Sequence, residues 1–559
     1  MPGEQDKLTR EQVLARWAAL KTERASWIPH WKEISTYLLP RSGRFFTRDR
    51  NRGDRRHNNI YDNTGVRALR VLAAGMMSGM TSPARPWFRL TTADENLADY
   101  APVKAWLADV CTLMHRIFQR SNTYRALHSG YEELGAFGTS SNIIVADFDT
   151  VIHNYPLTAG EYAIATNWKG QVTTLYREFE KTVGEVVAEF GLDKVSLAVK
   201  NAYDRGALDQ WVPIIHAIEP RKDRDPNAAD SKNMPWRSVY IEPSGRSGDV
   251  LRESGFNRFP ALCPRWSVSG GDQYGNSPGM EALGDVKQLQ LEQLRKAQAI
   301  DYQTNPPLQA PTSMANREVS TLPGGVTYVD MVGPNAGLRT AFDVRIDLSH
   351  LLLDIQDARH RVDGAFYADL FLLLANQTDV RMTATEVAER HEEKMLMLGP
   401  VLERLQDELL APLIEVTFQH ILAAGILPPP PQELQGHDIN LVLLGILAQA
   451  QRAIATNSVD RFVGNLGAVA QFKPDVLDKF DSDKWADIYA DALGLDPRII
   501  VPDDKVQVIR AQRQNAQAAA QQAALMNQGA DTAHKLASAN TGGQNALTDI
   551  TRAFSGYTT

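Results

Sequence analysis

The side chains best suited to binding a charged ligand form one dense basic run. Between positions 41 and 56 the sequence places seven arginines, together with Phe45 and Phe46. Guanidinium groups at this density can hold phosphates, but a solvated loop or a surface for an acidic protein gives the same pattern. Because the run stands alone, we favour the loop or protein-docking interpretation over nucleic-acid binding. The arginines are Arg41, Arg44, Arg48, Arg50, Arg52, Arg55 and Arg56.

Residue groupings typical of enzymes are missing from the sequence. It contains no Gly-rich phosphate loop of the ATPase type and no dinucleotide fingerprint. His391-Glu392 resembles the start of a zinc-protease helix, but the second histidine is missing four residues on. Asp285, Asp354 and Asp357 fall on polar helix faces, where exposed charge is the ordinary state. We therefore expect no catalytic residue, no metal and no cofactor.

Composition narrows the class of protein further. The 559 residues are 43% apolar and 23% charged, which is ordinary for a globular protein of two to four modules, and the net charge is −8. Because the chain is acidic, any contact with DNA should be local or transient. The two cysteines cannot form a disulfide framework. The polar N-terminus and the short apolar run at 439–450 predict a soluble protein made in the cytoplasm.

The elements that must position these residues are mostly helices. Ser277 is a plausible N-cap and Pro278 suits a first helical turn, after which apolar residues recur at helical period to about Ile300. A second amphipathic helix begins near Asp347. Between the two, residues 307–345 carry Pro, Gly and short β-prone runs, which predict a small strand-rich insertion.

A third, much longer helix is expected after a short polar loop at 376–382. Thr383 and Glu386 form a capping box that opens it, and its pattern continues to about residue 425. Pro400 predicts a kink midway, because proline removes a backbone hydrogen bond and crowds the preceding turn.

The first 275 residues predict an α+β unit in which helices lead and a β-rich part follows, so the whole chain is α+β and mainly α. Asn167-Trp168-Lys169-Gly170 is typical of a hairpin turn. Helices are expected at 8–40, 63–82, 103–119, 121–138, 183–190 and 194–203. Strands are expected at 142–146, 162–166, 171–177, 211–218, 238–242 and 261–267.

The last part of the chain changes in composition. Residues 436–500 predict several short helices. Residues 507–528 are rich in Ala and Gln and favour helix, but they offer few large apolar side chains. Such a helix buries little surface alone, so we expect a frayed tail or a bundle that requires oligomerisation.

In their order along the chain, these segments resemble the portal (head-to-tail connector) proteins of tailed bacteriophages, most closely those of short-tailed phages. The resemblance covers roughly residues 10 to 430. It is carried by 69–80 with 86–90, by 274–278, by the insertion, by 381–386 and by 409–413. The family's portal-type fold implies a wing at 1–275, a stem helix at 276–306, a clip at 307–345, a second stem helix at 346–375, a channel loop at 376–382, a long kinked wing helix at 383–425, a crown at 426–502 and a C-terminal helical tail at 503–559.

The resemblance also implies where DNA would be met. The channel loop would present Asn376, Gln377, Thr378, Asp379 and Arg381 to the duplex. The cations that would line the channel wall, mixed with acidic neighbours, are Lys287, Arg295, Lys296, Arg359 and Arg361.

The function implied is that of a non-enzymatic ring, usually of twelve subunits, at one capsid vertex of the virion. Double-stranded DNA would pass through it during packaging and ejection. The expected partners are a separate terminase ATPase, capsid and scaffolding proteins, and tail adaptor proteins, with no membrane. Two alternatives stay open at this point: a virion core, tail or scaffold protein without a pore, and a DNA-processing enzyme that grips DNA with the basic run.

Overall fold

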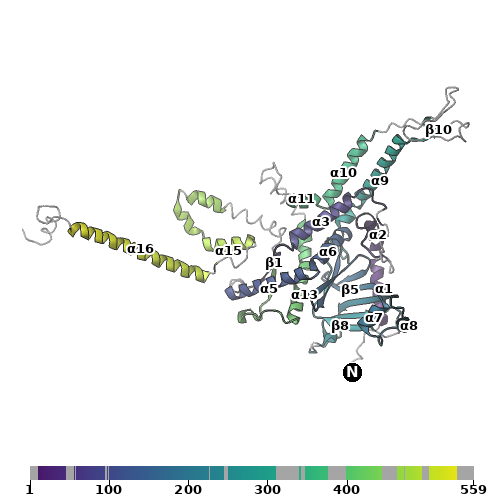
Figure 1. The fold of residues 1–559 in the computed structure, drawn as a ribbon, viewed down its shortest axis with the longest axis horizontal. Coiled ribbons are helices and arrows are strands. Elements are labelled where there is room, and N and C mark those ends of the chain that lie inside the picture. The colour runs from purple at the N-terminus through teal and green to yellow at the C-terminus, as the bar shows by residue number, and fades with distance from the viewer. Residues whose placement is uncertain are drawn as a thin grey trace, which may run out of the picture.

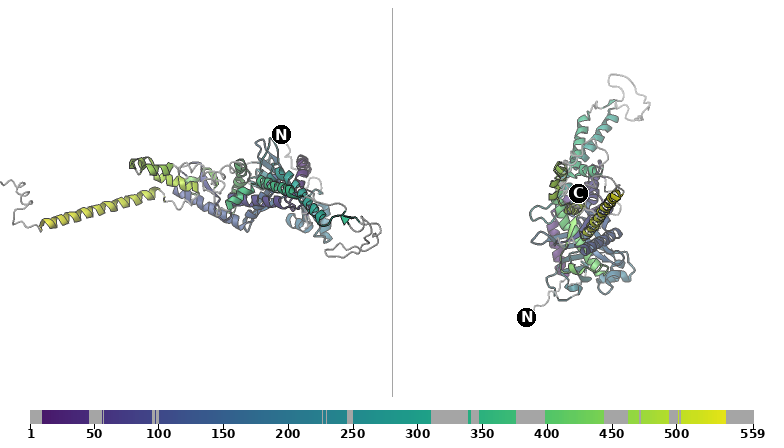
Figure 2. Two further views of the ribbon diagram at one scale, coloured as in Figure 1. Left: turned by 90° about the horizontal axis from the view of Figure 1, so that it is seen from above. Right: turned by 90° about the vertical axis from the view of Figure 1, so that its left-hand side faces the viewer.

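A computed structural model describes most of the chain (Figure 1). The residues it describes are 10–45, 56, 58–94, 97, 100–225, 227–228, 230–244, 250–309, 339–340, 347–375, 398–443, 462–470, 472–493, 501 and 503–537. Helices and sheets share one body, from which a two-helix stalk and a long C-terminal helix extend in different directions (Figures 1 and 2). The fold is α+β and mainly α, as the sequence predicts.

A five-stranded antiparallel sheet forms the lower end of the body in Figure 1, in the order β4-β5-β6-β7-β8. Its strands are β4 (Tyr162–Thr166), β5 (Val172–Thr182), β6 (Trp211–Pro220), β7 (Trp236–Ile241) and β8 (Arg252–Phe256). Along β6, Ile215 and Ala217 face the helix α1 (Arg10–Arg24), whereas Val212 and Ile214 face α7 (Val183–Phe190) and α8 (Leu197–Asp204). Alternation along the strand therefore buries both faces of the sheet under helices.

A second sheet joins the five-stranded sheet to the helical part. It pairs β3 (Val151–Leu157), β2 (Ser141–Asp147) and β9 (Ala261–Leu262) in antiparallel register. The sequence did not predict β3 or β8, and the strand expected at 261–267 covers only two residues. On the buried side of β3 the apolar Ile152 is followed by the polar Asn154, which lies beneath the helix α6 (Thr123–Phe137). The apolar alternation that marks a strand is therefore interrupted there.

The main hydrophobic core lies among the helices α2 (Trp27–Tyr37), α3 (Thr64–Met80), α5 (Ala101–Arg120) and α6 (Thr123–Phe137), with the first turns of α9. The single helix expected at 8–40 is divided at residues 25–26 into α1 and α2. On α3, a Cβ atom at Gly75 would lie 2.2 Å from the ring of Phe371. Glycine is therefore what allows α11 to approach α3 so closely.

The stalk is formed by α9 (Pro278–Thr304) and α10 (Ser349–Ala365), which lie side by side (Figures 1 and 2). Ser277 caps α9 by accepting a hydrogen bond from the backbone N–H of Met280 at 3.0 Å, as the sequence predicts. Leu289 packs against Ile355 and Ala358 along the seam. At the far end, β10 (Leu308–Gln309) pairs with β11 (Arg339–Thr340), while most of the insertion lies outside the described residues.

The helix expected at 346–375 is two helices. Tyr367 adopts a positive φ of 55°, which ends α10 and directs the chain into α11 (Ala368–Ala375). A residue whose backbone adopts the left-handed conformation cannot continue a right-handed α-helix. The position with positive φ holds a tyrosine, not the Gly or Asn that is usual there, so the sequence pattern did not indicate the break.

The long helix is described only from residue 398. Pro400 lies within a regular helical stretch, 398–405. A π-helical segment (Gln406–Leu410) follows it and precedes α13 (Ala411–Ala423), whose second residue is Pro412. Since proline lacks an N–H, the irregularity falls where Pro412 leaves a carbonyl of the preceding turn unpaired.

The segment expected to form only short helices begins with a strand. β12 (Ile439–Leu443) pairs with β1 (Phe88–Thr92) in antiparallel register and packs on the core of the body. Beyond it are a helix at 462–470, α15 (Ser482–Leu493) and α16 (Asp503–Ala537). The side chains described on α16 are nearly all exposed, and Arg510 pairs with Asp483 of α15 at 2.6 Å. The Ala/Gln-rich segment is thus one continuous helix.

Candidate functional site

Three of the five proposed channel-wall cations are neutralised by carboxylates of their own chain. Lys287 pairs with Glu33 of α2 at 2.5 Å, and Arg359 pairs with Asp62 at 2.7 Å. Arg361 of α10 donates to Asp285 of α9 at 2.9 Å and also contacts Asp357. These pairs connect the stalk helices to each other and to the body. Of the carboxylates considered as catalytic candidates on the sequence, Asp285 and Asp357 are thereby placed in ion pairs, whereas Asp354 shares a hydrogen bond with Glu292.

The other two cations of this set behave differently. Arg295 is exposed and Lys296 is half-buried on the outer half of α9. Among the residues that the structure describes, neither has a carboxylate partner. Within the described part of the chain they are thus the cations of the proposed wall that could meet an external charge.

Asp62 is the centre of the joint between stalk and body. Its Oδ1 accepts hydrogen bonds from the N–H and hydroxyl of Thr64, which begins α3. Its Oδ2 accepts from Gln293 of α9 at 3.0 Å and from Arg359 of α10. Burial alone would raise the pKa of Asp62, but the hydrogen bonds from Thr64 and Arg359 outweigh it and hold the pKa below its ordinary value.

The side chain of Gln290 completes this joint. It is buried on α9, and its amide oxygen accepts from the N–H groups of Tyr61 and Asp62 at 2.6 and 2.8 Å. Its amide nitrogen donates back to the carbonyl of Asp62 at 2.9 Å. One side chain thus satisfies three backbone groups of the segment that leads into α3, which fixes how the stalk leaves the body.

Two sets of predicted site residues lie wholly or partly outside the described residues. The channel loop, with Asn376, Gln377, Thr378, Asp379 and Arg381, follows α11 and is not described. Of the basic run, Arg41, Arg44 and Arg56 are described, whereas Arg48, Arg50, Arg52 and Arg55 are not. Arg44 pairs with Glu161 at 3.6 Å, and its N–H donates to the carbonyl of Ala159.

The side chains that could bind a metal are dispersed in the described part of the chain. No group of three or more His, Cys, Asp or Glu side chains there could hold a metal ion. Burial raises the pKa of the Cys111 and Cys263 thiols to about 11 and about 12, so both thiols stay protonated near neutral pH. His391 lies outside the described residues. No described helix is long and apolar enough to cross a membrane.

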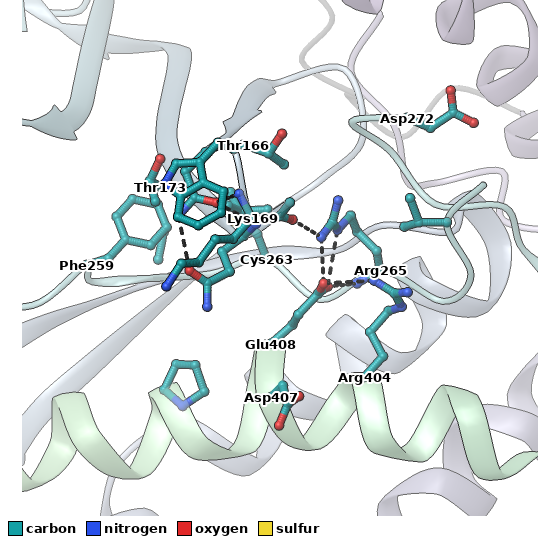
Figure 3. A pocket seen from close by; sticks show the side chains of 18 of the residues that line it. Thr166, Lys169, Thr173, Phe259, Cys263, Arg265, Asp272, Arg404, Asp407 and Glu408 are labelled. Carbon is teal, nitrogen blue, oxygen red and sulfur yellow. Dashed lines mark hydrogen bonds and ion pairs between the residues drawn. The ribbon is translucent and has the colours of Figure 1, made fainter. Parts of the chain in front are cut away.

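Sequence reasoning missed a polar cleft of about 1170 Å³ beside the β4–β5 turn (Figure 3). Arg265 lies at its base and donates to Glu408 of the π-helical segment, from Nη2 at 2.6 Å. The same Nη2 donates to the carbonyl of Gly170 at 2.7 Å. The pair joins the hairpin turn, the segment after β9 and the long helix. A sequence separation of 143 residues gives no local signal for it.

These contacts are joints between structural elements. Comparison with known proteins gives the family to which the chain belongs. Residues 10–501 match the family model described as bacteriophage head to tail connecting protein. This chain belongs to that family. Head-to-tail connecting proteins are components of the virion, at the junction between head and tail. The resemblance to portal proteins is confirmed, and neither of the two alternatives is favoured.

Individual relatives agree with the family model. A probable portal protein of Bordetella phage BPP-1 is 67% identical over 553 residues, which cover 99% of this chain and 100% of the relative. The portal protein of Salmonella phage epsilon15 is 46% identical over 545 residues, covering 97% and 98%. A chain from the neck of an empty gene transfer agent particle aligns with a TM-score of 0.38. The sequence identity is 12%, and the alignment covers 81% of this chain and 96% of that chain.

Proposed function

We propose that copies of this head-to-tail connecting protein close into a ring, twelve-fold as is usual in the family, that surrounds a DNA channel at one capsid vertex. The observation that carries this proposal is the stalk. Its two helices bury one apolar seam, but Leu291 of α9 and Leu352 and Leu353 of α10 remain exposed. Apolar side chains on an element so firmly anchored are expected where a neighbouring copy completes the packing.

Neutralised cations suit a conduit better than free ones. Duplex DNA carries about one charge per 1.7 Å, and a uniformly basic pore would bind it non-specifically at ~10⁻⁴–10⁻⁶ M. That corresponds to about 5.5–8 kcal/mol, which a packaging motor would have to overcome repeatedly. Carboxylates paired with Lys287, Arg359 and Arg361 reduce this attraction. DNA then meets Arg295, Lys296 and the channel loop at 376–382 without being held.

The direction of DNA movement requires partners. The chain supplies no ATPase motif, so a separate terminase drives packaging. The clip at 307–345, beyond the far end of the stalk, docks that motor first and tail adaptor proteins later. The wing contacts capsid and scaffolding proteins, and the basic run at 41–56 is a protein-docking loop. The chain itself is not an enzyme.

The experiment that tests the ring is the mass of the native assembly, combined with negative-stain images of the purified protein. We expect a closed ring with a central hole wide enough for duplex DNA. A chain that stays monomeric at every concentration and salt tested would contradict the proposal. So would a closed ring too narrow for duplex DNA in every state.

A further inference from the structure

The corner at which α5 ends and α6 begins carries four arginines that the channel proposal does not use. Arg116 and Arg120 lie about one turn apart near the end of α5, and Arg125 lies in the first turn of α6. Arg85 lies in the turn that precedes β1. All four side chains are exposed.

Hydrogen bonds hold the four positions in one place. The side chain of Gln119 donates to the carbonyl of Pro83 at 3.3 Å, and the N–H of Trp87 donates to His115 at 3.4 Å. The segment that carries Arg85 therefore runs against the last two turns of α5, next to Arg116 and Arg120.

The corner is also held by hydrogen bonds to Asn154 of β3, a side chain that is 1% exposed. Asn122 donates to the carbonyl of Asn154 at 2.7 Å and accepts from its N–H at 2.9 Å. The side chain of Asn154 donates to Thr123 at 2.9 Å and accepts from Asn142 at 2.7 Å. The backbone between Arg120 and Arg125 is therefore fixed before any ligand arrives, which lowers the entropy lost on binding.

Stability of the fold does not account for these arginines. Among the described residues none of the four has a carboxylate partner, although the chain as a whole carries a net charge of −8. Arg120 gains from its place at the C-terminal end of α5, but like charges at the spacing of Arg116 and Arg120 repel each other on a helix.

The surroundings favour a polyanion over a protein as the ligand. Protein interfaces are usually centred on aromatic or aliphatic anchors. In the described part of the chain, the strongly exposed large apolar side chains nearest in sequence lie on other elements: Tyr100 at the opposite end of α5, and Phe148 and Tyr155 on the β2–β3 hairpin. The cluster consists of guanidinium groups alone, and these match phosphate oxygens in geometry and charge.

We propose that Arg85, Arg116, Arg120 and Arg125 form a binding site for the phosphate backbone of duplex DNA on the body of the protein, separate from the channel loop. The site is independent of base sequence because it presents only charge and N–H donors. The inference rests on the proposed function, since it assumes that the assembled protein handles DNA.

The test is the salt dependence of duplex DNA binding by the assembled full-length protein. Each phosphate contact contributes about −0.9 to the slope of log K against log salt concentration. Arg116→Gln with Arg120→Gln should therefore make the slope shallower by about 1.8. Arg116→Lys with Arg120→Lys retains the charges and should keep the wild-type slope. The matched control, Arg205→Gln with Arg224→Gln, removes two exposed arginines elsewhere and should change nothing.

Two outcomes overturn the site. One is an unchanged slope in the glutamine variant, or a change no larger than that of the control. The other is loss of the native assembly mass in the glutamine variant, which would assign the arginines to a neighbouring copy. Failure of the proposed function is distinct, because the wild-type protein itself would then form no ring.

Discussion

Arg359 of α10 forms an ion pair with Asp62, which lies 297 residues earlier in the sequence. Its Nε and Nη2 both donate to Oδ2 of Asp62, at 3.1 and 2.7 Å. The Asp62 side chain is only 5% exposed, whereas that of Arg359 is 45% exposed. This pair, together with Gln290 and Gln293, joins the stalk to the start of α3. It is the contact on which the angle of the stalk depends.

Replacing Asp62 with Asn should destabilise the protein by about 1.5–3 kcal/mol at pH 7, because a buried charged acceptor is lost. The pKa of Asp62 lies below its ordinary 3.8 in the folded state. Its contribution is therefore present above that pH and lost as the pH falls through the folded pKa. Thermal unfolding at pH 7 and in acid measures both effects.

The control for Asp62→Asn is Asp363→Asn, which breaks the more exposed pair with Arg67 at 3.1 Å. The Asp363→Asn change should lower the free energy of unfolding by less than about 1 kcal/mol. An equal loss in the two variants would show that Asp62 has no special role in the joint.

Glu133 should make stability depend on pH in the opposite sense. Burial raises its pKa from 4.5 to about 7, although Thr158 and the N–H of Ala159 donate to it. In the folded state the carboxyl keeps its proton where the unfolded chain has lost it. Its contribution is complete below about pH 4.5 and is lost as the pH rises to about 7.

Glu133→Gln imitates the protonated carboxyl and should flatten this pH dependence. Melting temperatures at pH 5 and pH 8 measure it, with Glu132→Gln as the neighbouring control. A variant that loses as much stability between these pH values as the wild type would exclude Glu133 as the cause.

Gly75→Ala should destabilise the protein by about 1–3 kcal/mol, because the new methyl group would overlap the ring of Phe371. Gly284→Ala is the matched control within a helix, on α9, where a Cβ meets no atom within 4 Å. It should stabilise by about 0.5–1 kcal/mol. In urea unfolding, the free energy of unfolding should fall in Gly75→Ala and rise in Gly284→Ala. Equal changes in the two variants would contradict the close approach of α3 and α11.

Glu408→Ala should lower the free energy of unfolding by about 3–5 kcal/mol. The Arg265 side chain is 3% exposed, and the change leaves its guanidinium buried without a counter-charge. Glu415→Ala on the same helix removes a pair in which both side chains are 57% exposed. That change should cost at most about 1 kcal/mol. Similar unfolding midpoints for the two variants would mean that solvent already screens Arg265.

Arg381→Glu tests the channel loop. It should leave the native mass of the ring unchanged but impair DNA packaging or retention, since the acidic side chain would repel phosphates. Arg205→Glu, an exposed change on the body, is the control. Full packaging by the Arg381 variant would remove the loop from the mechanism.

Elements with local signals could be predicted from the sequence. Ser277 and Pro278 determine the start of α9 through a cap and a fixed φ, and both act within one turn. The helices of the body and stalk follow the 3.6-residue spacing of their apolar side chains. The positions of Arg361 and Asp285 on polar faces could also be read, although not that they pair with each other.

What the sequence could not reveal depends on distant partners. Four of the five residues of β12 are apolar and suit either a helix or a strand, and only β1 decides between them. Arg265 and Glu408 show no pattern until the fold brings them together. Tyr367 adopts its positive φ in the turn between α10 and α11, and the residue type gives no warning of it.

The pairing of β1 with β12 has a consequence for biosynthesis. The ribosome makes Phe88–Thr92 about 350 residues before Ile439–Leu443. At ~5–20 residues per second the interval is on the order of 20–70 s. During translation β1 is thus an open strand edge without its partner, liable to pair with another nascent chain. Completion of this two-stranded sheet is a late event of synthesis. Crowded polysomes, or chains truncated before β12, are the conditions under which the protein should aggregate.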